Sequence, residues 1–467
     1  MLRRRTIESI VLVFVLVLFF WISIQYIGND EGSYGYEAKL ILEGKHPIQD
    51  FITRAPPLTY LLAFLFRIFG ASLLITKILN ALLFALTGFL TYRLIKVWKS
   101  HETALCGALA VLLHPVFFLS RLSLNTTGLS VVFALAACGW VRRENKKKWI
   151  YAGILFALAF LTRESYLIFF LLMLTYCVLN RRTEKAKKIF YGFSITLILV
   201  AIFFCTQMNP HRFIDGFLGV GHLIIQEKMR PDNYHSRVGL FFLLSLLPFL
   251  FGLAVVRPVK TKLVRFYPEI IFLLSNMFFY IYFATRRGFL LSYGSEFIPF
   301  ICILFFSLIS SKRVLWVAVA PLFLFLTINF SEAHHVLPQN FFSLGELAGS
   351  STPRVKFAEV LNAVKKYSLS GDTVLAGNLA YVLESGRNSF ASITRPMAYE
   401  RDKDIYKIYE APTPEELAEA FDAYPPQIIV LDEHLSLSIW PVIRTHLGSL
   451  YSKVYSNQYA QVYSKLR

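Results

Sequence analysis

Two adjacent carboxylates, Asp30 and Glu31, directly follow the first long apolar run of the chain. Because the two carboxylates are adjacent, they repel each other. Because the chain passes here from hydrocarbon to the headgroups, they also lose part of their hydration. Both effects can prepare one of them to act as a general base. The alternative is a solvated helix start, because acidic residues are favoured in the first turn of a helix. The residues alone leave both interpretations open.

A cation suited to phosphate follows in the same polar segment. Arg54 comes three residues before Pro57, and its planar guanidinium can donate two parallel hydrogen bonds to phosphate oxygens. An arginine that anchors the chain at the membrane interface would look the same in sequence. The Pro56-Pro57 pair predicts a break between two helices.

Membrane-spanning helices are the elements that must hold these residues. Of the 467 residues, 55% are apolar and 17% are charged, whereas about 25% are charged in ordinary soluble domains. The apolar residues form runs that can cross about 30 Å of hydrocarbon. The net charge of +18 comes from the first 330 residues, which carry +20 while the rest carry −2, and basic cytoplasmic loops are the usual cause of such an excess. Composition therefore excludes a single soluble globule and argues against a nucleic-acid partner.

Eleven spans are predicted, and together they define a polytopic α-helical protein of the cell or inner membrane. The three arginines at positions 3–5 place the N-terminus in the cytoplasm, and an odd number of spans places the C-terminal segment outside. The predicted spans are 7–27, 72–95, 103–120, 124–141, 149–162, 165–179, 189–208, 238–256, 266–284, 297–311 and 314–330. Most acidic residues of this part fall in the predicted outer loops, which indicates an outer active face.

Three consecutive parts make up the predicted organisation of the chain: a transmembrane domain, a linker and an outer domain. Residues 1–330 form the transmembrane domain, with an outer loop at 28–71 whose helices at 33–43 and 57–69 are expected to lie flat on the membrane. The loop 209–237 is long enough to close as a lid over a donor. After a linker at 331–352, residues 353–467 predict a small outer α/β domain. Its helices are expected at 355–367 and 414–424, and its strands after Gly371 and at 427–432.

The first outer loop resembles that of GT-C glycosyltransferases, above all the protein O-mannosyltransferases and the lipid A aminoarabinose transferases. The matching residues are Asp30, Glu31, Tyr34, Ala38, Gly44, Pro47, Asp50, Phe51, Pro56, Pro57, Leu58, Tyr60 and Gly70. Segments 159–165 and 286–299 also resemble family motifs. The loop that begins at Ser120 does so too, but Asn125 replaces the family's usual acid there.

The resemblance implies inverting transfer of a hexosyl or pentosyl unit from a polyprenyl-phosphate carrier on the outer face. The acceptor would be a hydroxyl or phosphate of a glycan, lipid or protein. Asp30 is then the implied base, and Glu31 helps to orient the acceptor. The implied contacts of the donor phosphate are Arg54, Arg163, Arg286 and Arg287. The implied substrate contacts are Tyr34, Asp50, Tyr60, Glu164, Tyr293 and Glu296.

Several of these residues have a plainer interpretation. Arg163 and Glu164 can pair with each other, and Arg286 and Arg287 can anchor the chain at the membrane interface. Tyr293 can be a packing or interfacial aromatic residue. A transporter or lipid flippase is the alternative function, although such proteins often bury ionisable residues in mid-span and carry inverted repeats, which are not evident here. A receptor or scaffold whose outer domain binds a partner is the second alternative.

No cofactor is predicted, although a divalent metal remains an alternative. The first outer loop contains no Asp-x-Asp motif. The Asp402-Lys403-Asp404 motif is interpreted as a solvated turn, and the neighbouring His334 and His335 lack further ligands.

Overall fold

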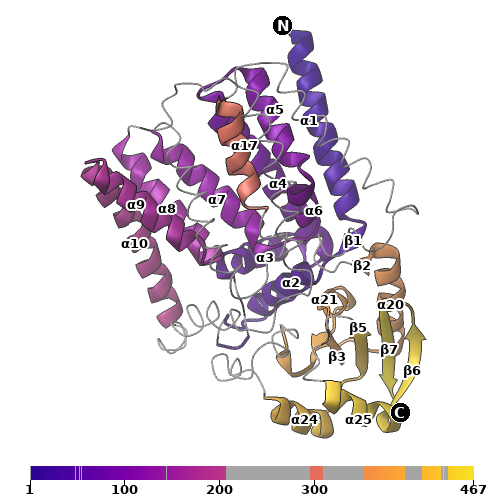
Figure 1. The fold of residues 1–467 in the computed structure, drawn as a ribbon. Helices are drawn as coiled ribbons and strands as arrows, with labels where there is room; N and C mark the ends of the chain where they lie inside the picture. Colours follow the sequence, from indigo (N-terminus) through magenta and orange to yellow (C-terminus); the bar gives the residue numbers. More distant parts are fainter. Residues whose placement is uncertain are drawn as a thin grey trace. The chain divides into compact units, whose positions relative to one another are not determined.

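The computed structural model describes residues 2–47, 49–51, 53, 55–143, 145–206, 295–308, 352–394, 413–432, 435 and 440–466. Figure 1 shows the elements that these residues form. Their contacts divide the chain into two compact units. The first unit comprises Met1–Trp21, Asn80–Val200 and Met229–Ala348, and the second comprises Ile22–Leu79, Ala201–Lys228 and Gly349–Arg467.

Apolar helices of different lengths form the described part of the first unit. They are α1 (Leu2–Ser23), α4 (Leu73–Lys96), α5 (His101–Leu112), α6 (Pro115–Ser120), α7 (Thr126–Val141), α8 (Lys146–Thr162), α9 (Tyr166–Leu179), α10 (Thr183–Cys205) and α17 (Phe297–Leu308), of which α1, α4 and α10 extend into the second unit. Each overlaps a predicted span. The span predicted at 103–120 is divided into α5 and α6, because Pro115 has no N–H group and begins a new helix instead of continuing the old one.

Close backbone contact and aromatic stacking hold these helices together. At the crossing of α8 and α10, a Cβ added to Gly153 would lie 2.1 Å from the Ile189 carbonyl oxygen. A Cβ added to Gly192 would lie 2.1 Å from the Ile150 carbonyl oxygen, so each helix presents a glycine to the backbone of the other. Beside this crossing, the rings of Phe170 and Phe193 stack with their centroids 3.7 Å apart.

Two of the described helices, α4 and α10, have the length and composition needed to cross a membrane. Helix α10 also leaves large apolar side chains exposed, among them Phe190, Ile198, Leu199 and Ile202. An apolar surface of this kind is typical of a helix that faces lipid. The number of eleven spans stays a prediction, and the spans predicted at 238–256, 266–284 and 314–330 lie outside the described residues.

Two helices of the second unit lie in the segment predicted as the first outer loop, and they confirm the helices predicted there. Helix α2 (Asn29–Leu42) begins at the acidic pair, and α3 (Pro56–Phe69) follows it. Proline occupies the first two positions of α3, where its missing N–H group costs no hydrogen bond. Gly70 ends α3 with a φ of 87°, a backbone conformation that favours glycine.

The rest of the second unit is a mixed α/β domain. Its elements are β2 (Thr352–Pro353), α20 (Arg354–Tyr367), β3 (Thr373–Ala376), α21 (Ala380–Ser385), β4 (Asn388–Ser389), the 3₁₀ turn η3 (Phe390–Ser392), α24 (Pro414–Ala423), β5 (Ile428–Asp432), α25 (Trp440–Leu450), β6 (Tyr451–Ser456) and β7 (Ala460–Lys465). The main sheet has the order β4-β3-β5-β7-β6. Strand β3 is parallel to β4 and β5, whereas β7 is antiparallel to β5 and β6. The predicted helices at 355–367 and 414–424 and both predicted strands are confirmed.

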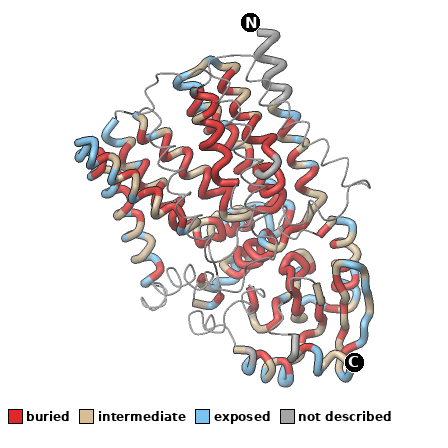
Figure 2. The backbone as a smooth tube through the Cα atoms, viewed as in Figure 1, coloured by how far each residue is buried: buried red, intermediate tan, exposed pale blue. Residues whose placement is uncertain are grey.

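Leu375, Phe421, Ile429 and Ile443 belong to the apolar core of this domain, which joins β3 and β5 to α24 and α25. Outside the main sheet, β1 (Tyr26–Ile27), which follows α1, pairs antiparallel with β2. Helix α2 packs against α21 and is buried along most of its length, as the red tube in Figure 2 shows. The first outer loop and the C-terminal domain, which the sequence assigned to different domains, therefore pack together.

Candidate active site

The acidic pair occupies the first turn of α2, where its two side chains have different surroundings. Asp30 is exposed, whereas Glu31 is fully buried. Glu31 is the third residue of the helix, and its Oε1 accepts the backbone N–H of Gly28 at 3.0 Å. A glutamate at this position can satisfy an N–H group that the helix itself leaves without a partner. The helix start foreseen as the plainer interpretation is therefore present, but only Asp30 is exposed.

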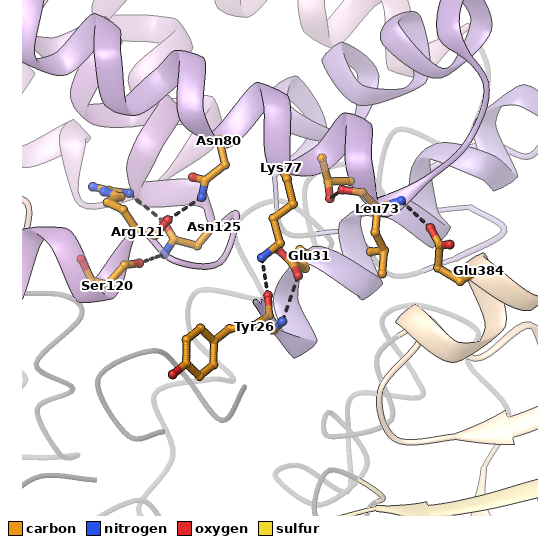
Figure 3. A network of polar contacts seen from close by, with 11 residues as sticks. Tyr26, Glu31, Leu73, Lys77, Asn80, Ser120, Arg121, Asn125 and Glu384 are labelled. Atoms are coloured by element: carbon orange, nitrogen blue, oxygen red, sulfur yellow. Dashed lines mark hydrogen bonds and ion pairs between the residues drawn. The ribbon is translucent and has the colours of Figure 1, made fainter. Parts of the chain in front are cut away.

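A buried lysine neutralises Glu31. The Lys77 ammonium of α4 lies 2.8 Å from Oε2 of Glu31, and 2% of the lysine side chain is exposed. The same ammonium donates a hydrogen bond of 2.6 Å to the Tyr26 carbonyl oxygen in β1. Figure 3 shows Lys77 between these two oxygen atoms. One lysine thus joins the start of α2 to α4 and to the strand after the first span.

Lys77 is not among the site residues predicted from the sequence. Its signal in the sequence is a single lysine near the start of an apolar run, because a charged side chain in such a run usually has a partner.

A second acid of α2, Glu37, is predicted only as one of several acids on the outer side. It is buried and accepts hydrogen bonds from the hydroxyls of Thr53 at 2.7 Å and Thr59 at 3.1 Å. These bonds tie the segment around the Pro-Pro pair to α2.

The remaining predicted site residues of the outer loop lie in different surroundings. Tyr34 is buried within α2. Asp50 is exposed, and its carboxylate accepts the His46 N–H at 2.7 Å, as expected for a residue that stabilises a turn. Tyr60 on α3 is half-buried and presents its ring edge-on to Phe203. Arg54 lies outside the described residues.

A second buried polar cluster belongs to the first unit. The Nε atom of Arg163 lies 2.5 Å from the carboxylate of Glu296, which is fully buried. Another nitrogen of Arg163 donates to the Thr127 hydroxyl at 3.0 Å. Glu296 comes one residue before α17, and burial raises the pKa of its carboxyl, a rise that the charges of Arg163 and Arg121 oppose. Glu164 is exposed, so the acid that pairs with Arg163 comes from a distant part of the chain.

Arg121 is a buried cation that the sequence analysis did not select. Its guanidinium donates to Oδ1 of Asn125 at 2.8 Å, and Asn125 in turn donates to the Ser120 carbonyl oxygen at 2.8 Å. The Asn80 amide donates to the Arg121 carbonyl oxygen, as drawn in Figure 3. Asn125, the residue at which this chain departs from the family pattern, therefore binds the arginine of the same loop. The Ser-Arg pair in that motif was the signal for this cluster.

Other predictions fall on residues that the structure does not describe. They concern Arg286, Arg287, Tyr293 and the lid predicted at 209–237. The Asp402-Lys403-Asp404 and His334-His335 motifs also lie outside the described residues. Among the residues that are described, no three His, Cys, Asp or Glu side chains are grouped closely enough to hold a metal ion.

Comparison with known proteins bears on the resemblance drawn from the first outer loop. Residues 53–204 match the family model of the dolichyl-phosphate-mannose-protein mannosyltransferases. The structure of ArnT from Cupriavidus metallidurans bound to undecaprenyl phosphate matches with a TM-score of 0.64 and 13% identity, over 98% of each chain. The chain has the membrane GT-C fold of this ArnT structure. The apo structure of the same ArnT matches this chain with a TM-score of 0.65 and 12% identity, over 99% of this chain and 98% of the ArnT chain.

The predicted resemblance to GT-C glycosyltransferases is thus confirmed, as is a helical membrane fold with a C-terminal mixed sheet. The matched family region begins three residues before α3 and ends within α10, so it includes Arg121 and Arg163 but not Asp30. No curated protein matches the chain.

Proposed function

We propose that this GT-C protein transfers a sugar from a polyprenyl-phosphate donor to a hydroxyl or phosphate acceptor at the outer face of the membrane. The observation that carries the proposal is the first turn of α2. There an exposed carboxylate, Asp30, stands beside a carboxylate that Lys77 neutralises. The matched family and the undecaprenyl phosphate held by the similar ArnT structure support the donor class.

In the proposed reaction, Asp30 accepts the proton of the acceptor group as the acceptor oxygen attacks the anomeric carbon of the sugar. The bond between that carbon and the phosphate oxygen breaks, and polyprenyl phosphate leaves with both electrons of the bond. Attack opposite the leaving group inverts the configuration at the anomeric carbon. Glu31 is buried and paired with Lys77, so in this proposal it holds the first turn of α2 in place. Its predicted contact with the acceptor, which would orient the acceptor, remains part of the proposal.

Cations stabilise the leaving phosphate in this proposal. Arg163 contacts Glu296 and Thr127, and a guanidinium can bind carboxylate and phosphate oxygens together. Arg121 is a second buried guanidinium whose Nε makes no hydrogen bond to any described residue. Arg54, Arg286 and Arg287 remain proposed phosphate contacts, and Tyr34, Asp50, Tyr60, Glu164, Tyr293 and Glu296 remain proposed substrate contacts.

The topology belongs to the same proposal. The N-terminus is cytoplasmic, and residues 353–467 form an outer domain after a transmembrane domain at 1–330 and a linker at 331–352. The loop 209–237 closes over the donor. Reaction of single cysteines, introduced at Lys45 and at Lys147, with an impermeant maleimide tests the orientation in intact cells. Labelling at position 45 alone supports it, and labelling at position 147 alone contradicts it.

The deciding experiment measures the release of free polyprenyl phosphate by purified protein in detergent. The donors are a panel of polyprenyl-phosphate hexoses and pentoses, each tested with several acceptors. The wild-type protein is expected to release the carrier from one donor, and Asp30→Asn to reduce the rate by about 10²–10⁴-fold, as loss of a general base does. Glu43→Gln, which removes an exposed carboxylate at the other end of α2, is the matched control. Release that does not depend on Asp30 contradicts its role. No release from any donor favours a transporter or flippase instead.

A further inference from the structure

One face of α2 lies against the C-terminal domain. Gly32, Gly35, Tyr36 and Lys39 follow one another at intervals of three, one and three residues, so they share one face of the helix. Each contacts the same part of the domain, namely α21, β4 or the segment between them. This face begins two residues after the proposed base, Asp30.

At Gly32 the two backbones come so close that no side chain fits between them. A Cβ added to Gly32 would lie 2.3 Å from the Ala380 amide nitrogen at the start of α21, closer than real Cβ contacts allow. The segment facing this glycine is itself held in place, because the Asn378 side chain accepts the Ala380 N–H at 3.0 Å and the Asn378 N–H binds Asp432 of β5 at 2.8 Å. The domain therefore presents a rigid backbone surface to the start of α2.

One turn further along, Tyr36 binds an edge strand of the sheet. Its hydroxyl oxygen accepts the Ser389 N–H of β4 at 2.8 Å, and 2% of Tyr36 is exposed. Burial raises the pKa of Tyr36 to about 12, so the hydroxyl stays neutral at any working pH. At the far end of the face, the Lys39 ammonium donates to the Arg387 carbonyl oxygen at 3.0 Å.

Two further bonds continue this attachment onto α4 and the strand after the first span. The first N–H group of α4, that of Leu73, donates to the Glu384 carboxylate of α21 at 2.6 Å, as Figure 3 shows. The Arg354 N–H at the start of α20 donates to the Gln25 carbonyl oxygen at 2.8 Å. The domain thus holds the three segments that meet at the Glu31–Lys77 ion pair, which are β1, α2 and α4.

We infer that the C-terminal domain is a positioning element of the active site, which fixes the start of α2, and with it the Asp30 carboxylate, through Gly32 and Tyr36. This inference rests on the proposed role of Asp30. Gly32 and Tyr36 touch neither donor nor acceptor, and they act through the placement of the helix. A displacement of about 1 Å in a catalytic group can lower a rate by about 10²-fold. The loss should appear in kcat and leave donor binding unchanged.

Two substitutions on α2 test the inference, and each has a matched control in the C-terminal domain. Tyr36→Phe removes only the hydroxyl that binds β4, and Tyr451→Phe removes a buried tyrosine hydroxyl that binds the Pro426 carbonyl oxygen within the C-terminal domain. Gly32→Ala adds a methyl group at the close approach, and Gly448→Ala adds one on α25 where no atom lies within 4 Å. If Gly32→Ala fails to fold, Tyr36→Phe alone decides.

The first measurement compares kcat and donor KM of the four variants. We expect kcat of Tyr36→Phe and Gly32→Ala to fall by roughly ten- to a hundredfold with donor KM within about twofold, while both controls keep wild-type kcat. The melting temperature of Tyr36→Phe should match that of Tyr451→Phe, since each loses one buried hydroxyl. An equal loss of kcat in Tyr451→Phe would mean that lost stability explains the effect, and would overturn the inference.

The second measurement needs no enzymatic activity. Asp30→Cys is introduced together with Cys205→Ser, which removes the exposed native thiol, and its reaction rate with a polar maleimide is measured against the same protein with Asp30 unchanged. Gly32→Ala and Tyr36→Phe should change this rate severalfold, and their controls should not. An unchanged rate together with unchanged kcat overturns the inference. A changed rate in a protein whose wild type releases no carrier contradicts the proposed function and still supports the positioning of α2.

Discussion

The Glu31 carboxylate and the Lys77 ammonium lie 2.8 Å apart, with 0% and 2% of their side chains exposed. The pair connects the turn that carries Asp30 to the start of α4, and the Tyr26 carbonyl oxygen takes a further hydrogen bond from the lysine. Two buried opposite charges stabilise little relative to apolar residues, but either one alone is costly. The main effect of this pair is therefore to fix the position of the first turn of α2 relative to α4.

Removing one member of this ion pair should destabilise the protein much more than removing both. Lys77→Met leaves Glu31 buried without its ammonium partner, and we expect it to lower the free energy of unfolding by about 3–5 kcal/mol. Combining Lys77→Met with Glu31→Gln should recover much of that loss. Thermal unfolding in detergent measures both, with Lys45→Met at an exposed site as the control. Additive effects of the two substitutions would contradict the coupling.

Loss of the Arg163 guanidinium should weaken donor binding. Arg163 contacts the buried Glu296 and Thr127, and it is a proposed phosphate contact. Since a hydrogen bond to a charged group contributes about 1.5–3 kcal/mol, Arg163→Gln should raise donor KM by roughly tenfold or more. Arg93→Gln, at an exposed arginine near the end of α4, should leave KM unchanged. An unchanged donor KM in Arg163→Gln would mean that Arg163 has only a structural role and does not contact the donor phosphate.

The crossing of α8 and α10 should not tolerate any side chain larger than glycine. A methyl group at Gly153 or Gly192 would meet a carbonyl oxygen of the other helix at 2.1 Å, so the helices would have to move apart. Overpacking of this kind costs about 1–3 kcal/mol. Gly153→Ala and Gly192→Ala should therefore both lower the melting temperature. Gly139→Ala is the control, because its new Cβ would lie 3.7 Å from Leu94, an ordinary contact distance; an equal decrease in all three variants would refute the close crossing.

The cluster around Glu359 in the C-terminal domain should make stability depend on pH. The hydrogen bond from the Tyr455 hydroxyl, and then that from the Lys356 ammonium, lower the pKa of Glu359, while its carboxylate raises the pKa of Lys356. A lowered carboxyl pKa stabilises the fold above the unfolded value of about 4.3, and the effect disappears as the pH falls through the folded value.

We therefore expect Glu359→Gln to lower the melting temperature at pH 7 and to have little effect at pH 3. Lys356 follows the opposite sign, because its raised pKa stabilises the fold below the unfolded value and the contribution is lost as the pH rises through the folded value. A difference between wild type and Glu359→Gln that is the same at both pH values would contradict the pKa assignment. Glu419→Gln, at an exposed site on α24, serves as the control.

Local patterns in the sequence determined the elements of this protein. Apolar runs predicted the long helices, the acidic pair and the Pro-Pro pair marked the starts of α2 and α3, and apolar segments between turns predicted β3 and β5. These signals act over a few residues, since they depend on helix caps, backbone freedom and the alternation of apolar side chains. The family motif in the first outer loop was of the same local kind, and it indicated the GT-C fold before any tertiary contact was known.

Only the tertiary structure decided which residues are partners. Lys77 binds Glu31, Arg163 pairs with Glu296 and not with its neighbour Glu164, and Tyr36 binds a strand more than 350 positions later in the chain. Composition and periodicity predict whether a residue prefers a buried or an exposed environment. They do not predict which distant residue becomes its partner. A buried charge has to find an opposite charge, because desolvation without one is too costly, and the fold determines which one lies within reach. For the same physical reason, the sequence could place an acidic pair at the membrane surface, but only the packing of α2 separated the exposed Asp30 from the buried Glu31.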